Sequence, residues 1–202
     1  MPLSQWEQDV FIHPTADVSS LASIGRGTKI WHFVHVREGA IIGAECVISK
    51  DVYIDHDTCI GNYVRIQNGV SVYKGVTIED KVFVGPYCSF TNDLRPRAGS
   101  AGWEIIPTRL RYGASVGANC TIVCGVVLGQ FSMIAAGSVV TEDALPFGLY
   151  VGSPARLKGF VSTQGFEMSL VNAAASCLTY RCKKTGEGLE INFKTTPPPK
   201  NL

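Results

Sequence analysis

The 202-residue chain has 46% hydrophobic residues and a formal charge of +1 at pH 7, so it is long enough for one globular domain with a substantial core. The near-neutral charge does not favour a nucleic-acid or membrane-surface partner, and we expect neither. Residues 1–10 contain no apolar run, so we expect neither a signal peptide nor a membrane span, and a cytoplasmic location is the default. Seven cysteines without paired spacing also fit a reducing compartment.

The dominant feature of the sequence is an aliphatic or aromatic residue at every sixth position. This period matches neither the 3.6 residues of a helix nor the two residues of a half-buried strand. It fits a short strand plus a tight turn, three of which close one coil of about 18 residues. The series consists of Ile12, Val18, Ile24, Ile30, Val36, Ile42, Ile48, Ile54, Ile60, Ile66, Val72, Ile78, Val84 and Phe90.

A second apolar or small residue follows four positions after these residues, and we expect both to fill the inside of a solenoid whose coils share their burial. Cys46, Cys88 and Cys120 occupy that second position, so we expect them to pack as small apolar residues. A glycine often comes directly after the aliphatic residue, where we expect a turn that a Cβ would strain. Examples are Gly25, Gly43, Gly61 and Gly85.

The period breaks after Phe90 and resumes at Leu110. Fourteen hexads before the break and six after it, up to Val140, make 20 hexads, or between six and seven coils. The excursion between them, residues 91–109, contains two arginines and a tryptophan. A long excursion from a solenoid is usually functional, and this composition favours that interpretation.

The repeat degrades at Pro146, so we place a coiled domain at residues 1–160 and a C-terminal extension at residues 161–202. The extension has a helix-compatible stretch near residues 166–177 and a proline-rich end that we expect to be poorly ordered. Cys177 and Cys182 would form half of a zinc ribbon. No second Cys or His pair follows, so we interpret both as unpaired thiols and expect no metal site.

Several motifs fall in order at irregular places along the repeat. They are Phe11-Ile-His-Pro-Thr-Ala16, Ile30-Trp-His-Phe-Val-His-Val36, Ile66-Gln-Asn-Gly-Val-Ser-Val-Tyr73, Gly85-Pro-Tyr-Cys-Ser-Phe-Thr-Asn92, Gly117-Ala-Asn-Cys-Thr-Ile-Val-Cys-Gly125 and Val151-Gly-Ser-Pro-Ala-Arg156. With them, residues 11–160 resemble the hexapeptide-repeat acyltransferases, in particular the sugar-nucleotide 3-amino N-acetyltransferases. The resemblance implies an all-β fold, a left-handed parallel β-helix of hexapeptide repeats with residues 91–109 extruded as a loop.

The resemblance also implies acetyl-CoA as the donor, a homotrimer, and active sites in clefts between neighbouring prisms. The implied reaction is attack of a neutral sugar amine on the thioester carbonyl, which requires alignment and oxyanion donors more than a strong base. Relatives that act on hydroxyls typically use a His base, and the matching position here is Asn92. Its carbonyl oxygen can orient an amine, while the leaving CoA sulfur takes the proton. The alternative is that Asn92 only turns the chain into the loop.

Candidate substrate contacts lie in two of these motifs and in the loop. The resemblance favours sugar-nucleotide contacts by the Trp-His-Phe-Val-His motif, although solvated histidines are equally open. The two adjacent amides suit a ligand or solvent, and the tyrosine packs on the substrate or on the next coil. The two loop arginines suit a diphosphate or a carboxylate, or are only solvated. These residues are Trp31, His32, His35, Gln67, Asn68, Tyr73, Arg95 and Arg97.

The acceptor has two candidates. The resemblance points first to UDP-2-acetamido-3-amino-2,3-dideoxyglucuronate, an intermediate of bacterial surface polysaccharide. Enzymes that act on this uronic acid tend to carry Asn where this chain has Arg95. That departure leaves a dTDP-linked 3-amino-3,6-dideoxyhexose open as the acceptor.

For the donor, the family places the pantetheine of CoA along the last coils, where small residues permit close approach to the backbone. Basic residues just past the prism would meet the phosphates of the adenosine end, and a basic turn without a ligand is the competing interpretation. The candidate residues are Gly117, Ala118, Ala135, Ala136, Gly137, Arg156 and Lys158.

Two other classes share the fold. The γ-type carbonic anhydrases bind zinc through three histidines across a subunit interface, but no histidine follows His56 here, so that pattern is missing. A non-catalytic β-helix scaffold would show the hexads but need not keep the loop around Asn92 or the Pro154-Ala-Arg156 terminus.

Overall fold

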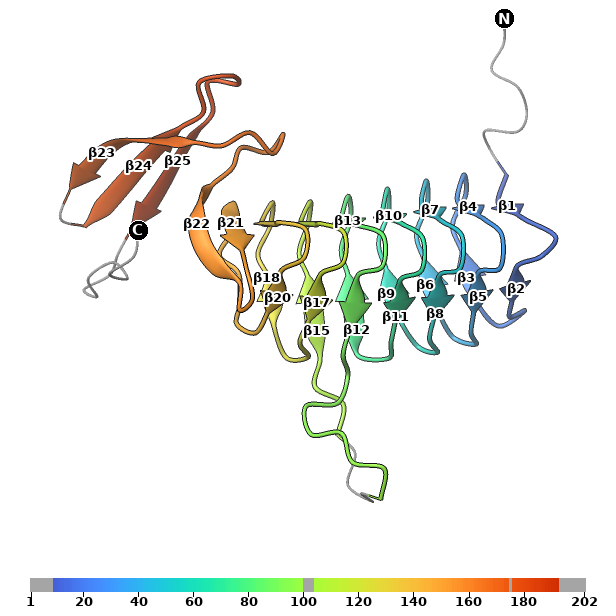
Figure 1. The fold of residues 1–202 in the computed structure, drawn as a ribbon. Coiled ribbons are helices and arrows are strands. Elements are labelled where there is room, and N and C mark those ends of the chain that lie inside the picture. Colours follow the sequence, from blue (N-terminus) through green and yellow to red (C-terminus); the bar gives the residue numbers. More distant parts are fainter. Residues whose placement is uncertain (1–8, 100–103, 175, 193–202) are drawn as a thin grey trace, which may run out of the picture.

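The computed structural model describes residues 9–99, 104–174 and 176–192, and every regular element within these ranges is a β-strand. Short strands wind into a parallel coil, and each strand from β1 to β17 pairs with the third strand after it (Figure 1). This confirms the expected all-β, left-handed parallel β-helix. Within the same ranges, no helix is long and apolar enough to cross a membrane.

The coil has three sheets. Sheet A contains β1 (Phe11–Ile12), β4 (Lys29–Ile30), β7 (Val47–Ile48), β10 (Arg65–Ile66), β13 (Phe83–Val84), β16 (Ser115–Val116), β19 (Met133–Ile134), β21 (Gly148–Val151) and β22 (Arg156–Phe160). Sheet B contains β2 (Asp17–Val18), β5 (His35–Val36), β8 (Tyr53–Ile54), β11 (Ser71–Val72), β14 (Ser89–Phe90), β17 (Thr121–Ile122) and β20 (Val139–Val140). Sheet C contains β3 (Ser23–Ile24), β6 (Ile41–Ile42), β9 (Cys59–Ile60), β12 (Val76–Ile78), β15 (Thr108–Leu110) and β18 (Val127–Leu128).

Each coil is numbered from its strand in sheet A, so that coil 1 begins at β1 and coil 5 at β13. The turns between sheets form three rows along the molecule, which we call the AB, BC and CA corners after the sheets they join. Residues 91–107 leave the prism at the BC corner of coil 5, between β14 and β15. Figure 1 shows this loop standing away from the prism, as the broken period predicted.

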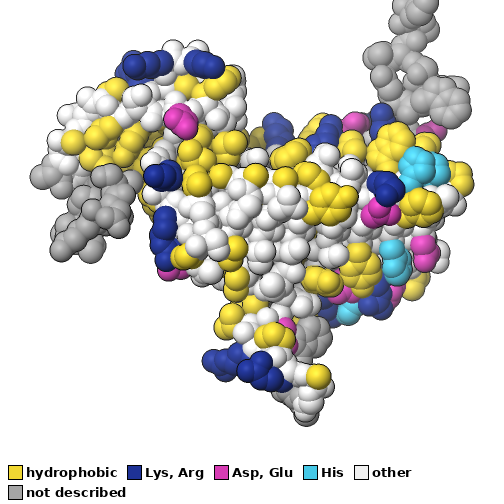
Figure 2. All heavy atoms as spheres, viewed as in Figure 1, with side chains coloured by type: hydrophobic (Ala, Val, Ile, Leu, Met, Phe, Trp, Pro, Cys, Tyr) yellow, Lys and Arg dark blue, Asp and Glu magenta, His cyan; other side chains and the backbone are white. Residues whose placement is uncertain are grey.

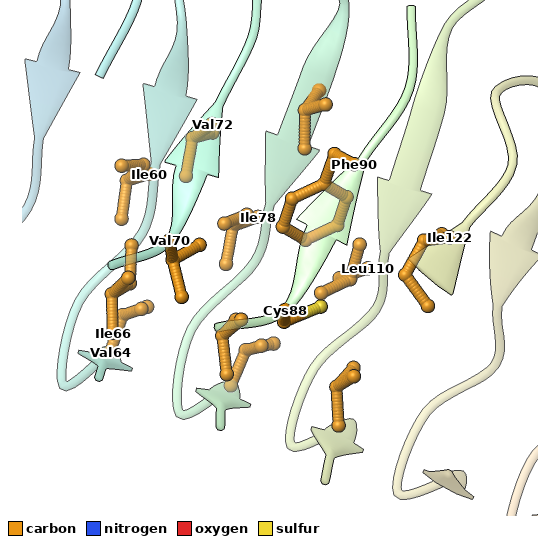
Figure 3. Close-up of a cluster of buried hydrophobic side chains, with 14 of the residues drawn as sticks. Ile60, Val64, Ile66, Val70, Val72, Ile78, Cys88, Phe90, Leu110 and Ile122 are labelled. Carbon is orange, nitrogen blue, oxygen red and sulfur yellow. The ribbon is translucent and has the colours of Figure 1, made fainter. Parts of the chain in front are cut away.

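The core is a stack of the hexad residues. From Ile30 to Val140 every residue of the series is at most 3% exposed, and Figure 3 shows these side chains in register from coil to coil. Ile12 is 43% exposed, because coil 1 has a neighbouring coil on only one side. The predicted core cysteines are confirmed as buried, and burial raises the pKa of the Cys88 thiol to about 12.

The glycines that follow the aliphatic residues are required for a reason other than the turn strain that we expected. Gly43 and Gly85 do not have a positive φ. A Cβ on Gly43 would lie 2.6 Å from the carbonyl carbon of Gly61, and a Cβ on Gly85 would lie 2.6 Å from that of Gly117. These glycines are required because the backbones of adjacent coils approach each other closely at the corner, and not because of their own dihedral angles.

The β-helix also continues past Val140, the last residue of the regular hexads. Ala144 bridges to Leu128, and β21 pairs in parallel with β19, so the coil extends to Val151 despite Pro146. The inward position there is taken by Tyr150, whose hydroxyl oxygen accepts a hydrogen bond from the N–H of Leu145 at 3.0 Å. Tyr150 is buried and aligns with Ile134, which lies 16 residues before it instead of the 18 of a regular coil. The shortened last coil therefore falls outside the six-residue period.

The expected helix near residues 166–177 is wrong. An antiparallel sheet occupies this part of the extension, with strands β23 (Ser169–Ala174), β24 (Cys177–Arg181) and β25 (Gly188–Asn192). Hairpin pairing and a small core of Phe160, Met168, Tyr180 and Cys182 outweigh the weak helical propensity. Cys177 in β24 and Cys182, directly after this strand, are free thiols. Residues 195–202, which we expected to be poorly ordered, lie outside the described ranges.

The close approach of the coils predicts the effect of a single methyl group. Gly85→Ala should lower the free energy of unfolding by about 1–3 kcal/mol, since its Cβ meets the backbone of coil 6, which has no room to move. The matched control is Gly159→Ala, where nothing lies within 4 Å of the added atom and the change should stay within about 0.5 kcal/mol. Chemical denaturation of both variants measures the difference, and equal stability would contradict this account.

Candidate functional site

Apart from Arg156 and Lys158 on β22, the sequence-predicted site residues lie on sheet B and along its two corners. His35 lies on β5 of sheet B, and its side chain faces outward. The AB corner carries Trp31, His32, Gln67, Asn68, Gly117, Ala118, Ala135, Ala136 and Gly137. The BC corner and its loop carry Tyr73, Asn92, Arg95 and Arg97. The structure therefore divides the candidates between the two edges of one sheet.

Two threonines anchor the loop at the BC corner. The hydroxyl oxygen of Thr91 accepts a hydrogen bond from the N–H of Cys124 at 2.9 Å, and that of Thr108 accepts one from the N–H of Gly125 at 3.1 Å. Both ends of the loop are thereby tied to the same turn of the next coil. Asn92 directly follows the first anchor and is half-buried, so its backbone is held at a defined place on the corner. Neither threonine was among the predicted site residues, although each flanks the break in the period.

The loop encloses a hollow of about 670 Å³, lined in the described ranges by residues that include Arg95, Arg97, Asp93 and Glu104. Asp93 shapes its start, since its Oδ1 accepts a hydrogen bond from the N–H of Arg95 at 2.7 Å. Both arginines are exposed, and Figure 2 shows Lys and Arg side chains at the surface of this loop. The hollow that follows Asn92 thus combines two exposed guanidinium groups with two carboxylates.

The outer surface of sheet B changes along its length. In coils 2 and 3 the outward residues are His35 and Tyr53, and from coil 4 onward they are small, as in Ser71, Ser89 and Thr121. The Tyr53 ring lies 5.5 Å from that of His35 and 6.0 Å from that of Tyr73. Tyr53 was not among the predicted site residues, although the period itself indicates that it faces outward.

Asp55 fixes this part of the BC corner. Its Oδ1 accepts hydrogen bonds from Arg37 at 3.1 Å, from the Tyr53 hydroxyl at 3.0 Å and from the N–H of His56 at 2.8 Å, and its Oδ2 accepts one from the N–H of Lys74 at 3.1 Å. Burial alone would raise the pKa of Asp55, but the hydrogen bonds from Lys74, His56 and Tyr53 outweigh it and lower the pKa. One ionised carboxylate thus joins coils 2, 3 and 4.

At the N-terminal end of the AB corner the aromatic side chains stack on one another. The His32 ring lies 3.6 Å from that of His13 and is parallel within 9° to that of Trp31. Partial desolvation and the neighbouring His32 lower the pKa of His13. Trp31 and His32 lie three coils before Asn92, roughly 14 Å along the axis, and at the opposite edge of sheet B. The structure therefore does not bring them next to Asn92.

The AB corner of coils 6 and 7 is lined by small residues, and two of its glycines differ in their surroundings. A Cβ on Gly117 would lie 2.5 Å from the backbone nitrogen of Ala136, so this glycine is required by coil stacking. Gly137 is exposed, and nothing lies within 4 Å of an added Cβ, so its surface is open to a ligand. Gln67 and Asn68, two coils before Gly117 on the same corner, donate no side-chain hydrogen bond to other described residues.

The basic residues past the prism lie close to this corner. The turn after β21 is tied to coil 7, since the N–H of Gly152 donates to the Ser138 hydroxyl at 3.1 Å and the N–H of Ala155 donates to the carbonyl of Val139 at 2.7 Å. Arg156 and Lys158 follow on β22 and are exposed on one face of this strand. They therefore extend the row of small residues with positive charge.

Among the described residues, no three His, Cys, Asp or Glu side chains come together as a metal-binding group. The four histidines are spread over the first coils, and His56 contacts Asp57 at 2.9 Å.

Comparison with known proteins gives three findings. Residues 21–56 match the family model "Bacterial transferase hexapeptide (six repeats)". The chain is 38% identical over 187 residues to the dTDP-3-amino-3,6-dideoxy-alpha-D-galactopyranose 3-N-acetyltransferase of Aneurinibacillus thermoaerophilus, which covers 93% of this chain and 97% of the relative. It is 30% identical over 156 residues to the bifunctional protein GlmU of Anaplasma marginale, of which it spans 36%.

One solved structure that the chain matches is that of PerB from Caulobacter crescentus in complex with CoA and GDP-perosamine. The sequence identity is 22% and the TM-score is 0.49, and the match covers 76% of this chain and 58% of that one. The relationship to the Aneurinibacillus enzyme spans nearly the full length of both chains. By its repeat, its fold and this relationship, the chain belongs to the hexapeptide-repeat sugar-nucleotide N-acetyltransferases.

Proposed function

We propose that the protein transfers the acetyl group of acetyl-CoA to the 3-amino group of a nucleotide-linked amino sugar. The observation that carries this proposal is the 38% identity, over nearly the full length, to an enzyme named for 3-N-acetylation of a dTDP-linked 3-amino sugar. A dTDP-3-amino-3,6-dideoxyhexose is accordingly the first acceptor we propose. The UDP-linked 3-amino uronic acid is the second, because the loop arginines offer partners for its carboxylate.

In the proposed mechanism, Asn92 orients the acceptor. Its side-chain carbonyl accepts a hydrogen bond from the neutral amine and directs the nitrogen lone pair at the thioester carbonyl. The new C–N bond forms as the C–S bond breaks, and the amine proton passes to the leaving thiolate of CoA. No strong base is needed, which fits an amide at this position. The anchored base of the loop supports this role by holding the backbone of Asn92.

We further propose that a homotrimer completes the site. Asn92 lies at the BC corner, whereas the small residues proposed for CoA lie at the AB corner, so sheet B separates the two groups within one chain. In a three-fold assembly of parallel prisms, the BC corner of one copy faces the AB corner of the next. The loop of one copy would then cover the CoA of its neighbour.

Asn92→Ala should lower kcat roughly 10- to 100-fold, the rate equivalent of one hydrogen bond of about 1.5–3 kcal/mol in the transition state. The melting temperature and the oligomeric state should stay those of the wild type. Steady-state measurement of CoA thiol release provides the rate. Gln130→Ala, which removes an exposed amide from the CA corner, is the matched control; near wild-type turnover of Asn92→Ala would contradict the role of Asn92.

The choice of acceptor is tested by measuring thiol release with both candidates side by side. We expect the dTDP-linked 3-amino-3,6-dideoxyhexose to have the higher kcat/KM, because the relative is named for this class. If the uronic acid is preferred, Arg95→Ala should raise its KM more than that of the deoxyhexose, since a carboxylate partner is lost. Absence of turnover with both would refute the proposed function.

A further inference from the structure

Three side chains of coils 2, 3 and 4 form an aromatic ladder at the BC edge of sheet B: His35 and Tyr53 on the sheet and Tyr73 at the corner. Adjacent rings lie 5.5 and 6.0 Å apart and are inclined to each other by 68° and 57°. None of them belongs to the core, where the inward neighbours of the first two, Val36 and Ile54, are fully buried. The ladder is therefore aromatic surface that folding of the β-helix does not require.

The ladder is held in place. The Tyr53 hydroxyl donates to Asp55 at 3.0 Å, and the same carboxylate accepts from Arg37 and from the N–H of Lys74, the residue after Tyr73. Asp55 is 8% exposed, so these bonds are protected from water and hold the ring and both flanking turns. A fixed ring loses little conformational freedom when a ligand stacks on it.

The position of the ladder along the axis indicates which ligand it suits. The donor residues proposed above lie in coils 6 to 8, on the C-terminal side of Asn92 in coil 5. The acceptor must therefore extend from Asn92 toward the N-terminal coils. Tyr73 and Tyr53 lie one and two coils before Asn92, roughly 5 and 10 Å along the axis at the spacing of paired strands. The part of the acceptor farthest from its amine is the nucleotide base.

The charges beside the ladder favour the base over the diphosphate. Arg37 is already paired with Glu38 and Asp55, and Lys74 with Asp57. The five side chains carry two positive and three negative charges, so they offer a diphosphate no net attraction. The exposed loop arginines remain for the diphosphate, and the ladder remains for an uncharged flat ring.

We propose that His35, Tyr53 and Tyr73 form the platform for the pyrimidine base of the nucleotide sugar, and that Asp55 is the positioning residue that holds Tyr53 in it. This inference rests on the proposed function. Nucleobases stack on aromatic side chains largely irrespective of sequence, and hydrogen bonding of the tyrosine hydroxyl to Asp55 presents the ring rather than the hydroxyl to the ligand.

The test is isothermal titration calorimetry of the full-length protein with dTDP, UDP, inorganic pyrophosphate and CoA. Tyr53→Ala should weaken binding of dTDP and UDP about 10-fold or more, since a stacking partner is lost, and leave pyrophosphate and CoA within about twofold. Tyr63→Ala, which removes an exposed ring from the CA corner, is the matched control and should change none of the four. Should Tyr53→Ala fail to fold, His35→Ala and Tyr73→Ala replace it.

Kinetics test the role of Asp55. Asp55→Ala should raise KM for the nucleotide sugar several-fold with little change in kcat at saturation and in KM for acetyl-CoA, and Asp55→Asn should recover part of the loss. A merely structural role would lower the amount of active enzyme and leave KM unchanged.

Three results would overturn the platform: unchanged dTDP and UDP affinity in the ladder variants, loss of CoA affinity instead, or a wild-type protein that binds neither nucleotide. The proposed function fails separately. A wild-type protein that binds dTDP through Tyr53 but acetylates neither amino sugar would refute the proposed function and support the platform. Acetylation by the wild type, with an unchanged KM for the nucleotide sugar in Tyr53→Ala, would support the proposed function and refute the platform.

Discussion

The structure depends on the close contact between the backbones of successive coils. Each coil lies about 4.8 Å from the next, and at the corners the approach leaves no room for a Cβ at positions such as Gly43 and Gly85. This contact fixes the register, so residues one coil apart in sequence stand directly above one another. A linear pattern is thereby converted into rows of side chains, and every site on the surface is built from these rows.

The irregular parts are attached to this lattice by single polar side chains. Thr91 and Thr108 fasten the loop to coil 6, and Asp55 joins three coils beneath it. Glu79 does the same on sheet C, where it accepts hydrogen bonds from Arg109 at 2.7 Å and from the N–H of Tyr112 at 2.9 Å. Each of these groups satisfies backbone donors that the coil leaves free where its regular pairing is interrupted.

The period of six was sufficient to predict the β-helix, its 20 regular hexads, the buried cysteines and the loop, because each follows from burial alone. It did not reveal the last strand of the coil, because Tyr150 aligns with Ile134 at a distance of 16 residues instead of the regular 18. It also did not reveal the C-terminal antiparallel sheet, whose strands lie outside the six-residue repeat. For the site, the family resemblance suggested Asn92, and residue type suggested the arginines. The contribution of Tyr53 and Asp55 depends on contacts across coils, which only the folded chain displays.

The C-terminal end of the prism has a consequence for assembly. A parallel solenoid presents an open strand edge at each end, on which a further coil could be laid down without limit. Here β22 reverses direction and pairs antiparallel with β21, with a shift in register between Leu149 and Tyr150. At sheet A an incoming coil meets a strand of the opposite polarity, so the reversed strand opposes continuation of the parallel coil by a second molecule.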